Sequence, residues 1–127
     1  MTGYVARRDW LRENRGTAVR FLQAVLMAYD VLQKDPGVGI RAVATEMGIS
    51  ERNVKRIYRD APPPNIYWWT DHGYRYSLVG ESGFHRRLEY LETFLLDEKV
   101  VSQEVDVSNA LDASFITEAL RTWKKDQ

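Results

Sequence analysis

Apolar side chains recur at helical spacing over three long stretches of the chain. Between residues 17 and 34 they fall at offsets of three, four and seven, which places them on one face of a helix. The segment 35–37, Asp-Pro-Gly, is expected to end this helix. The stretches 83–98 and 108–125 show similar spacing, and Ser82 can cap the first of them. The pattern therefore predicts a mainly α-helical chain.

The first sixteen residues carry four arginines around an apolar pair, Trp10 and Leu11. We expect this segment, 1–16, to form a basic arm or a short helix. Gly16 is expected to end it. Thr17 is expected to cap the next helix, because its hydroxyl can accept a hydrogen bond from an N–H group of the first turn.

Two short helices with a tight turn between them are predicted from residue 41 to about residue 60. Residues 38–40 are too few to form more than one β-bridge. Residues 41–47 form the first helix, Gly48 and Ile49 the turn, and Ser50 caps the second helix. The apolar positions expected to face inward are Val43, Met47, Ile49, Val54 and Ile57.

A β-hairpin is predicted over residues 66–79. Three prolines at 62–64 exclude a helix there. Beyond them, aromatic and β-branched residues flank a glycine-containing turn at 71–73, which is typical of paired strands. The aromatic residues either pack the sheet onto the helices or stack on bases or a ligand. Residues 100–107 alternate apolar and polar, so a strand and a loop both remain open there.

The segment 40–59 resembles the helix-turn-helix of transcription regulators, and with the hairpin it resembles their winged form. Ala44 stands where the two helices would cross, and Gly48 stands in the turn. The fold class expected is mainly α with a small β-hairpin. In it, a winged helix-turn-helix domain at 17–80 is followed by a helical dimerisation element at 81–127. The resemblance implies that the second helix enters the major groove of double-stranded DNA.

Cations dominate the outward positions of that second helix. Arg52 or Arg56 can bond a guanine edge, whereas Lys55 and Arg59 suit phosphates. A solvated basic face is the alternative interpretation. The hairpin tip departs from the family, because the acidic Asp71 would repel phosphate. The DNA-binding candidates are Arg41, Ser50, Glu51, Arg52, Asn53, Lys55, Arg56 and Arg59, together with His72 and Arg75 from the hairpin.

Formal charge is zero overall but unevenly distributed. Residues 1–87 hold 14 Lys and Arg against 9 Asp and Glu, and residues 88–127 hold 4 against 9. A basic front and an acidic back suit a protein that contacts DNA with one part and a second copy with the other. A monomer whose last helices fold back is the alternative. The candidate dimer contacts are Phe84, Leu88, Leu91, Leu95, Phe115, Leu120 and Trp123.

The chain has no cysteine, and its two histidines lack partners at metal-ligand spacing. No phosphate-binding glycine loop or catalytic serine motif is present. We therefore expect no metal, no cofactor, no enzymatic activity and no membrane span, and a cytoplasmic, nucleoid-associated location. The expected function is a repressor acting as a homodimer. A replication, partition or termination protein and a protein-interaction module remain as alternatives.

Overall fold

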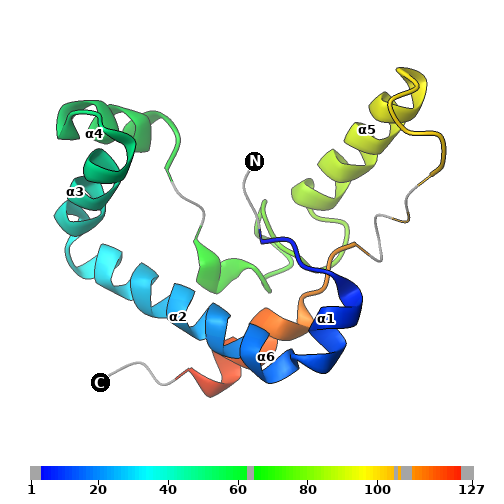
Figure 1. Ribbon diagram of the computed structural model, residues 1–127, viewed down its shortest axis with the longest axis horizontal. Coiled ribbons are helices and arrows are strands. Elements are labelled where there is room, and N and C mark those ends of the chain that lie inside the picture. Colours follow the sequence, from blue (N-terminus) through cyan, green and yellow to red (C-terminus); the bar gives the residue numbers. More distant parts are fainter. Residues whose placement is uncertain (1–3, 63–64, 105, 107–109, 124–127) are drawn as a thin grey trace.

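The computed structural model describes residues 4–62, 65–104, 106 and 110–123, and this part of the chain is built from helices joined by turns (Figure 1). The elements are α1 (Arg8–Glu13), α2 (Arg15–Lys34), α3 (Pro36–Met47), α4 (Glu51–Asp60), the 3-10 helix η1 (Ile66–Trp68), α5 (Gly83–Asp97) and α6 (Ser114–Thr122). Helix α2 is the longest and lies at the centre. Helices α3 and α4 lie at its C-terminal end and α6 lies along its N-terminal half.

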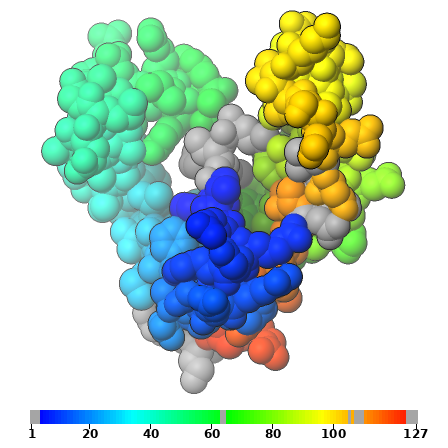
Figure 2. Space-filling model, turned by 45° about the vertical axis from the view of Figure 1, so that its right-hand side comes forward, coloured from blue at the N-terminus to red at the C-terminus, as the bar shows by residue number. Residues whose placement is uncertain are grey.

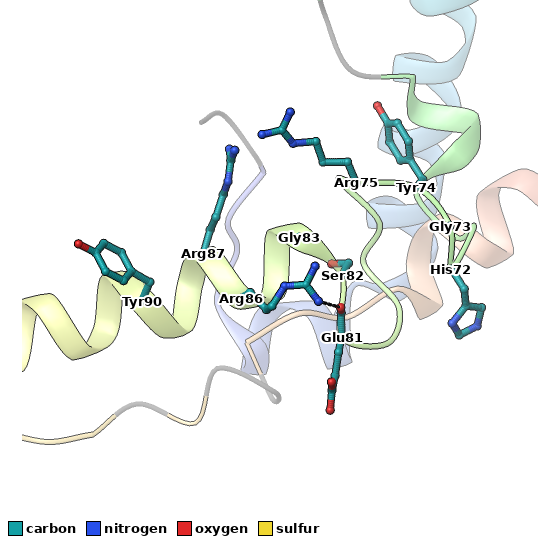
Figure 3. Close-up of a pocket in the computed structure, with 10 residues that line it drawn as sticks. All are labelled: His72, Gly73, Tyr74, Arg75, Glu81, Ser82, Gly83, Arg86, Arg87 and Tyr90. Atoms are coloured by element: carbon teal, nitrogen blue, oxygen red, sulfur yellow. Dashed lines mark hydrogen bonds between the residues drawn. The ribbon is translucent and has the colours of Figure 1, made fainter.

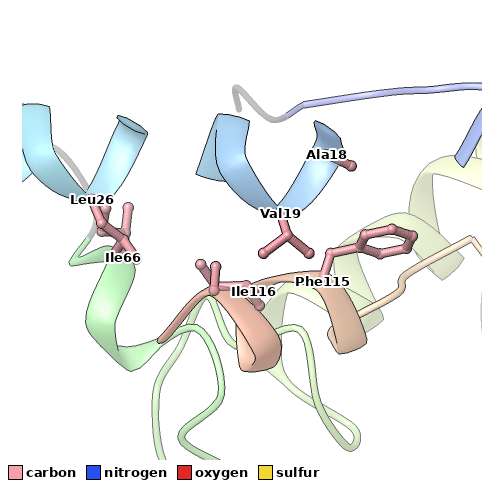
Figure 4. Packing of buried hydrophobic residues seen from close by; sticks show 7 residues of the cluster. Ala18, Val19, Leu26, Ile66, Phe115 and Ile116 are labelled. Atoms are coloured by element: carbon pink, nitrogen blue, oxygen red, sulfur yellow. The ribbon is translucent and has the colours of Figure 1, made fainter. Parts of the chain in front are cut away.

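The core forms where α2 meets α6 and η1. Val19 and Leu26 point from α2 toward Ile116 of α6 and Ile66 of η1, as Figure 4 shows. Leu26 is fully buried, and a buried aliphatic side chain of this size contributes about 2 to 3 kcal/mol. Residues from both ends of the chain therefore share one core, which crosses the domain boundary expected at residue 80.

Polar contacts fix the position of α6 on α2. The guanidinium of Arg15 lies 2.8 Å from the Glu118 carboxylate and 4.5 Å from the ring centre of Phe115. Further along both helices, the Gln23 amide donates to the Thr122 hydroxyl at 2.8 Å. These contacts link the two helices at two points beside their shared apolar core.

The start of α2 differs from the sequence prediction. Gly16 lies inside α2, and the break after α1 falls at Asn14. Thr17 does not cap the helix; its hydroxyl accepts from Arg20 instead. A glycine within a helix costs about 1 kcal/mol, which the burial of the neighbouring Ala18 and Val19 outweighs.

Helix α3 begins five residues earlier than predicted, at Pro36 rather than at Arg41, so residues 38–40 are helical and form no bridge. The Asp35 carboxylate accepts from the Gly37 N–H at 2.9 Å and caps the helix. Pro36 occupies the first helical position, where its fixed φ suits the helix and its missing N–H would have had no partner. The segment that ends α2 thus also starts α3.

The predicted β-hairpin is wrong, because the described residues contain no β-strand. Residues 66–79 instead form η1 and a series of turns. Asn65 accepts from the Tyr67 N–H at 3.0 Å, and Asp71 accepts from the Gly73 N–H at 2.8 Å. Such local bonds offer backbone groups partners other than a strand ladder. The fold is mainly α without a wing, and the interaction-module alternative loses the hairpin that was to make its contact.

The turns of residues 69–82 are closed by a buried serine pair. Ser77 Oγ donates to the Trp69 carbonyl at 3.1 Å, and the Leu78 N–H donates to the same oxygen at 2.7 Å. Ser82 Oγ donates to the Ser77 carbonyl at 2.7 Å and accepts from the His85 N–H at 3.2 Å. Ser82 therefore caps α5, as predicted, and fastens that helix to the preceding turns.

The last two helices are shorter than predicted. Helix α5 ends at Asp97 rather than Glu98, and α6 spans Ser114–Thr122 within the expected range 108–125. Residues 107–109 and 124–127 lie outside the described residues. Residues 100–104 contain no strand, while residues 105 and 107 of the same predicted segment are not described.

One polar contact lies at the edge of the core. The Tyr67 hydroxyl donates a hydrogen bond to the Asp30 carboxylate of α2, and the Tyr67 and Tyr29 rings meet edge to face at 5.6 Å. Burial, assisted by the bond to Asp30, raises the pKa of Tyr67 from 10.0 to about 12. The protonated phenol is therefore the form that the folded chain favours.

Replacing Tyr67 with phenylalanine is expected to lower the free energy of unfolding by about 1 to 2 kcal/mol, because Asp30 would no longer have its charge-assisted partner. In the native chain this stabilisation is fully present below about pH 10 and is lost as the pH rises through about 12, since the folded pKa is raised. Urea unfolding at neutral and alkaline pH measures both effects. Equal stability of the variant and the native chain at pH 7 would contradict the assignment.

Candidate nucleic-acid interface

Helices α3 and α4 are joined by a tight turn centred on Gly48. Gly48 has φ of 63° in the left-handed region, where a residue with a Cβ is strained. The Ile49 N–H donates to the Ala44 carbonyl at 3.1 Å, and the Gly48 N–H donates to the Thr45 carbonyl at 3.3 Å. These bonds satisfy the last carbonyls of α3. The sequence prediction of a turn at this glycine is confirmed.

Helix α4 starts with the predicted cap. Ser50 has extended backbone angles, and its hydroxyl accepts from the Asn53 N–H at 3.3 Å. Glu51 follows in the first turn, where a carboxylate is favoured by the helix dipole. Ser50 and Glu51 both favour the start of a helix. Only three residues therefore separate the end of α3 from the start of α4.

Packing of α4 against α3 depends chiefly on Val54, which is fully buried. Tyr58, one turn later, is half-buried. Two of the residues predicted to face the core do not: Ile57 is 47% exposed and Met47 is 62% exposed. The reason is that α4 packs closely only on α3 within the described residues, so only one side of it is covered.

The cations of α4 lie on the side opposite Val54. At 3.6 residues per turn, Arg52, Lys55, Arg56 and Arg59 fall within an arc of about 100° centred away from the buried side. All four are exposed. Arg59 lies 2.9 Å from the Asp60 carboxylate, whereas the other three make no hydrogen bond or ion pair with any described residue. Three full charges are therefore available to an anionic partner.

The other candidates on this motif are placed differently. Glu51 and Asn53 are exposed at the start of α4, while the hydroxyl of Ser50 is used by the cap. Arg41 lies in the middle of α3 rather than at its start, and its guanidinium is 3.7 Å from the Asp35 carboxylate. Arg41 is thus partly neutralised and lies one helix away from the cations of α4.

His72 and Arg75 do not belong to a wing, because the hairpin is absent from the described residues. They line an open hollow of about 680 Å³ beside the start of α5 (Figure 3). Its lining residues are His72, Gly73, Tyr74, Arg75, Glu81, Ser82, Gly83, Arg86, Arg87 and Tyr90. The sequence analysis missed Arg86 and Arg87. The available signal was their position as an arginine pair in the first turns of a helix capped by Ser82.

The candidate dimer contacts separate into two groups. Phe115 is buried in the chain's own core, and Leu120 and Trp123 pack against that core, so α6 does not present them to a partner. On α5, Phe84, Leu88 and Leu95 are half-buried and Leu91 is 43% exposed. The last two helices were expected to be free for a partner, because the preceding domain was expected to cover its own core; α6 is instead part of that core.

The described residues contain neither a metal-binding group of side chains nor a helix that could span a membrane. No group of three or more His, Asp or Glu side chains is arranged there to hold a metal ion. None of the helices in the same ranges combines the length and apolarity needed to cross a membrane.

A scan of the chain against protein-family models found no match, and searches of curated proteins and of solved structures found none either. The functional interpretation therefore rests on the geometry and charge of α3, α4 and the hollow beside α5.

Replacing Gly48 with valine is expected to lower the free energy of unfolding by about 2 kcal/mol, because a β-branched residue is strained at positive φ. Space is not the cause, since a Cβ at Gly48 would meet no described atom within 4 Å. Asparagine at the same position should cost less, because it tolerates this conformation. Thermal and urea unfolding measure the difference.

The matched control is Gly16→Ala in α2. Gly16 does not have positive φ, and a Cβ there makes an ordinary contact with the Arg20 side chain at 3.6 Å. This variant should be more stable than the native chain by about 0.5 to 1 kcal/mol. A native melting temperature for Gly48→Val would contradict the role assigned to the turn.

Proposed function

We propose that this chain binds double-stranded DNA by placing α4 in the major groove. The observation that supports the proposal most directly is the exposure of Arg52, Lys55 and Arg56, without partners among the described residues, opposite the buried Val54. A helix with its side chains is about 10 to 12 Å across, which matches the roughly 12 Å width of the groove. The packing of α4 supports the same proposal, because among the described residues only α3 packs closely on it and its cationic side is left uncovered.

The chemistry of the cations suggests separate roles. The guanidinium groups of Arg52 and Arg56 are planar donors that suit a guanine edge, and they lie one turn apart on the same side of α4. Lys55 suits phosphate contacts, which strengthen binding without reading sequence. Arg59, at the last turn and paired with Asp60, is more suited to the DNA backbone than to bases.

The biological role proposed is sequence-specific regulation of transcription, with repression by occupying the DNA site. Replication, partition and termination proteins would use the same contact between α4 and the groove. The proposal is therefore made at the level of DNA recognition, and the regulatory role follows from which sites the protein selects.

Replacing both Arg52 and Arg56 with glutamine is expected to weaken binding to a selected site by about 10- to 100-fold for each arginine that bonds a base edge in the native complex. Lys55→Gln should instead weaken binding to all sequences alike and reduce the slope of log affinity against log salt by about 0.9. Site selection from random DNA followed by fluorescence anisotropy gives both quantities. Circular dichroism should remain native.

The control for charge is Arg121→Gln on α6, which removes one exposed cation far along the chain from α4. It should bind as the native chain does. Failure of the native chain to bind any duplex, even at low salt, would overturn the proposal.

We propose further that two copies associate through α5. Tyr90, Leu91 and Phe94 form one patch at offsets of three and four, and they are 75%, 43% and 49% exposed. Helix α5 packs closely on no other helix among the described residues, and Figure 2 shows it as a lobe apart from α3 and α4. A second α5 is a partner whose apolar patch matches by symmetry.

Replacing Leu91 and Phe94 with glutamate is expected to convert a dimer to a monomer, because each copy would place two charges in the shared contact. Sedimentation equilibrium measures the change. Met27→Glu, at an exposed apolar position of α2, is the matched control and should leave the association state unchanged. A native chain that sediments as a monomer at high concentration would contradict the dimer.

A further inference from the structure

The hollow beside α5 gathers positive charge from two segments of the chain. Arg75 comes from the turns after η1, and Arg86 and Arg87 come from the first turns of α5. In Figure 3 the side chains of Arg75 and Arg87 extend to the same side of the chain, whereas the Glu81 carboxylate points to the opposite side. Neither guanidinium group is thus neutralised by Glu81, the acidic residue among those that line the hollow.

The partners of these arginines differ. Arg86 donates to the Glu81 carbonyl at 2.7 Å, which holds its side chain against the turn. The Arg75 guanidinium lies 5.5 Å from the ring centre of Tyr76. Arg87 makes no hydrogen bond, ion pair or ring contact with any described residue. Arg75 and Arg87 therefore keep their donor groups for a ligand, and Arg86 adds charge from a fixed position.

Backbone donors lie beside these side chains. The His85 N–H is taken by the Ser82 cap, but the N–H groups of Gly83 and Phe84 have no acceptor among the described residues. The loop approaches so closely that a Cβ on Gly83 would lie 3.0 Å from the Arg75 carbonyl. The start of a 15-residue helix thus forms one wall of a hollow that also contains arginine side chains.

We propose that this hollow binds a phosphate group of the nucleic-acid backbone, chiefly through Arg75 and Arg87. The inference rests on the DNA binding proposed for α4 and adds a second contact point on the same polymer. Arginine and free helix N–H groups together suit a phosphate oxygen in charge and in donor geometry. The hollow is open rather than enclosed, which suits one phosphate of a continuous strand.

A polymer explains the two cationic surfaces better than a small phosphate compound does. The α4 cations and the hollow lie on different elements, and Figure 2 shows α4 and α5 in separate lobes with a hollowed face between them. A free phosphate compound would bind at only one of the two surfaces, so it would not account for the positive charge of the other. A nucleic-acid backbone offers phosphates at regular intervals to both.

The test measures binding of the full chain to a short duplex of random sequence over a range of salt concentrations. Arg75→Gln combined with Arg87→Gln is compared with Lys55→Gln combined with Arg59→Gln, the two α4 cations proposed to contact phosphates. The matched control is Arg20→Gln combined with Arg121→Gln, which removes two exposed charges from α2 and α6. The hollow variant is expected to lower the slope of log affinity against log salt by about 0.9, because one phosphate contact is lost, and to lower affinity at low salt by at least about tenfold.

Four outcomes separate the two proposals. A reduced slope in the hollow variant, with native circular dichroism and a native control, supports the inference. Binding that only the α4 variant weakens overturns the inference and leaves the function of α4 intact. Binding that only the hollow variant weakens supports the inference about the hollow and overturns the role proposed for α4. A native chain that binds no duplex overturns both.

Discussion

The apolar face of α2 has to be covered along its whole length, and the rest of the fold depends on how this is done. Val19 and Leu26 lie two turns apart on α2, and no sheet is present in the described residues to cover them. Helix α6 and the short η1 cover this face instead, and the ion pair of Arg15 with Glu118 adds a polar link between α2 and α6. The C-terminal end of α2 then continues through the Asp35 cap into α3. The position of α3, and of α4 packed on it, is thus set by the same helix that organises the core.

Helix α4 stands at the edge of this arrangement and has little packing of its own. Val54 is its only fully buried side chain, and burial of one valine contributes about 1.5 to 2 kcal/mol. Its geometry therefore depends on local features, namely the Ser50 cap and the left-handed Gly48. An element held mainly by its start can expose most of its surface, and α4 does so on the side that carries its cations.

Some end signals of helices could be predicted from the sequence, although the starts of α2 and α3 could not, and neither could the choice of packing partner. The Ser50 and Ser82 caps and the turn at Gly48 are local, and the structure shows all three. The aromatic run of the expected hairpin has strand propensity, but polar side chains beside it bond the backbone in turns. Phe115 was predicted to contact a partner, but it packs against α2 in the core. Ile57 was predicted to face the core, but its side chain stays half exposed. Periodicity identifies the apolar side of a helix, and the neighbouring elements determine whether that side is covered.

Net charge is a poor guide to what this chain binds. Exposed charges interact over a Debye length of about 8 Å at physiological ionic strength, so charges separated by much more than this distance are largely screened from one another. The cations of α4 and those of the hollow therefore act on whatever lies directly against them. The acids that balance them in the total are in excess beyond residue 87, so the overall charge is zero while the two surfaces stay positive. A polyanion that reaches both surfaces would meet arginine at each, which is the condition for salt-sensitive binding.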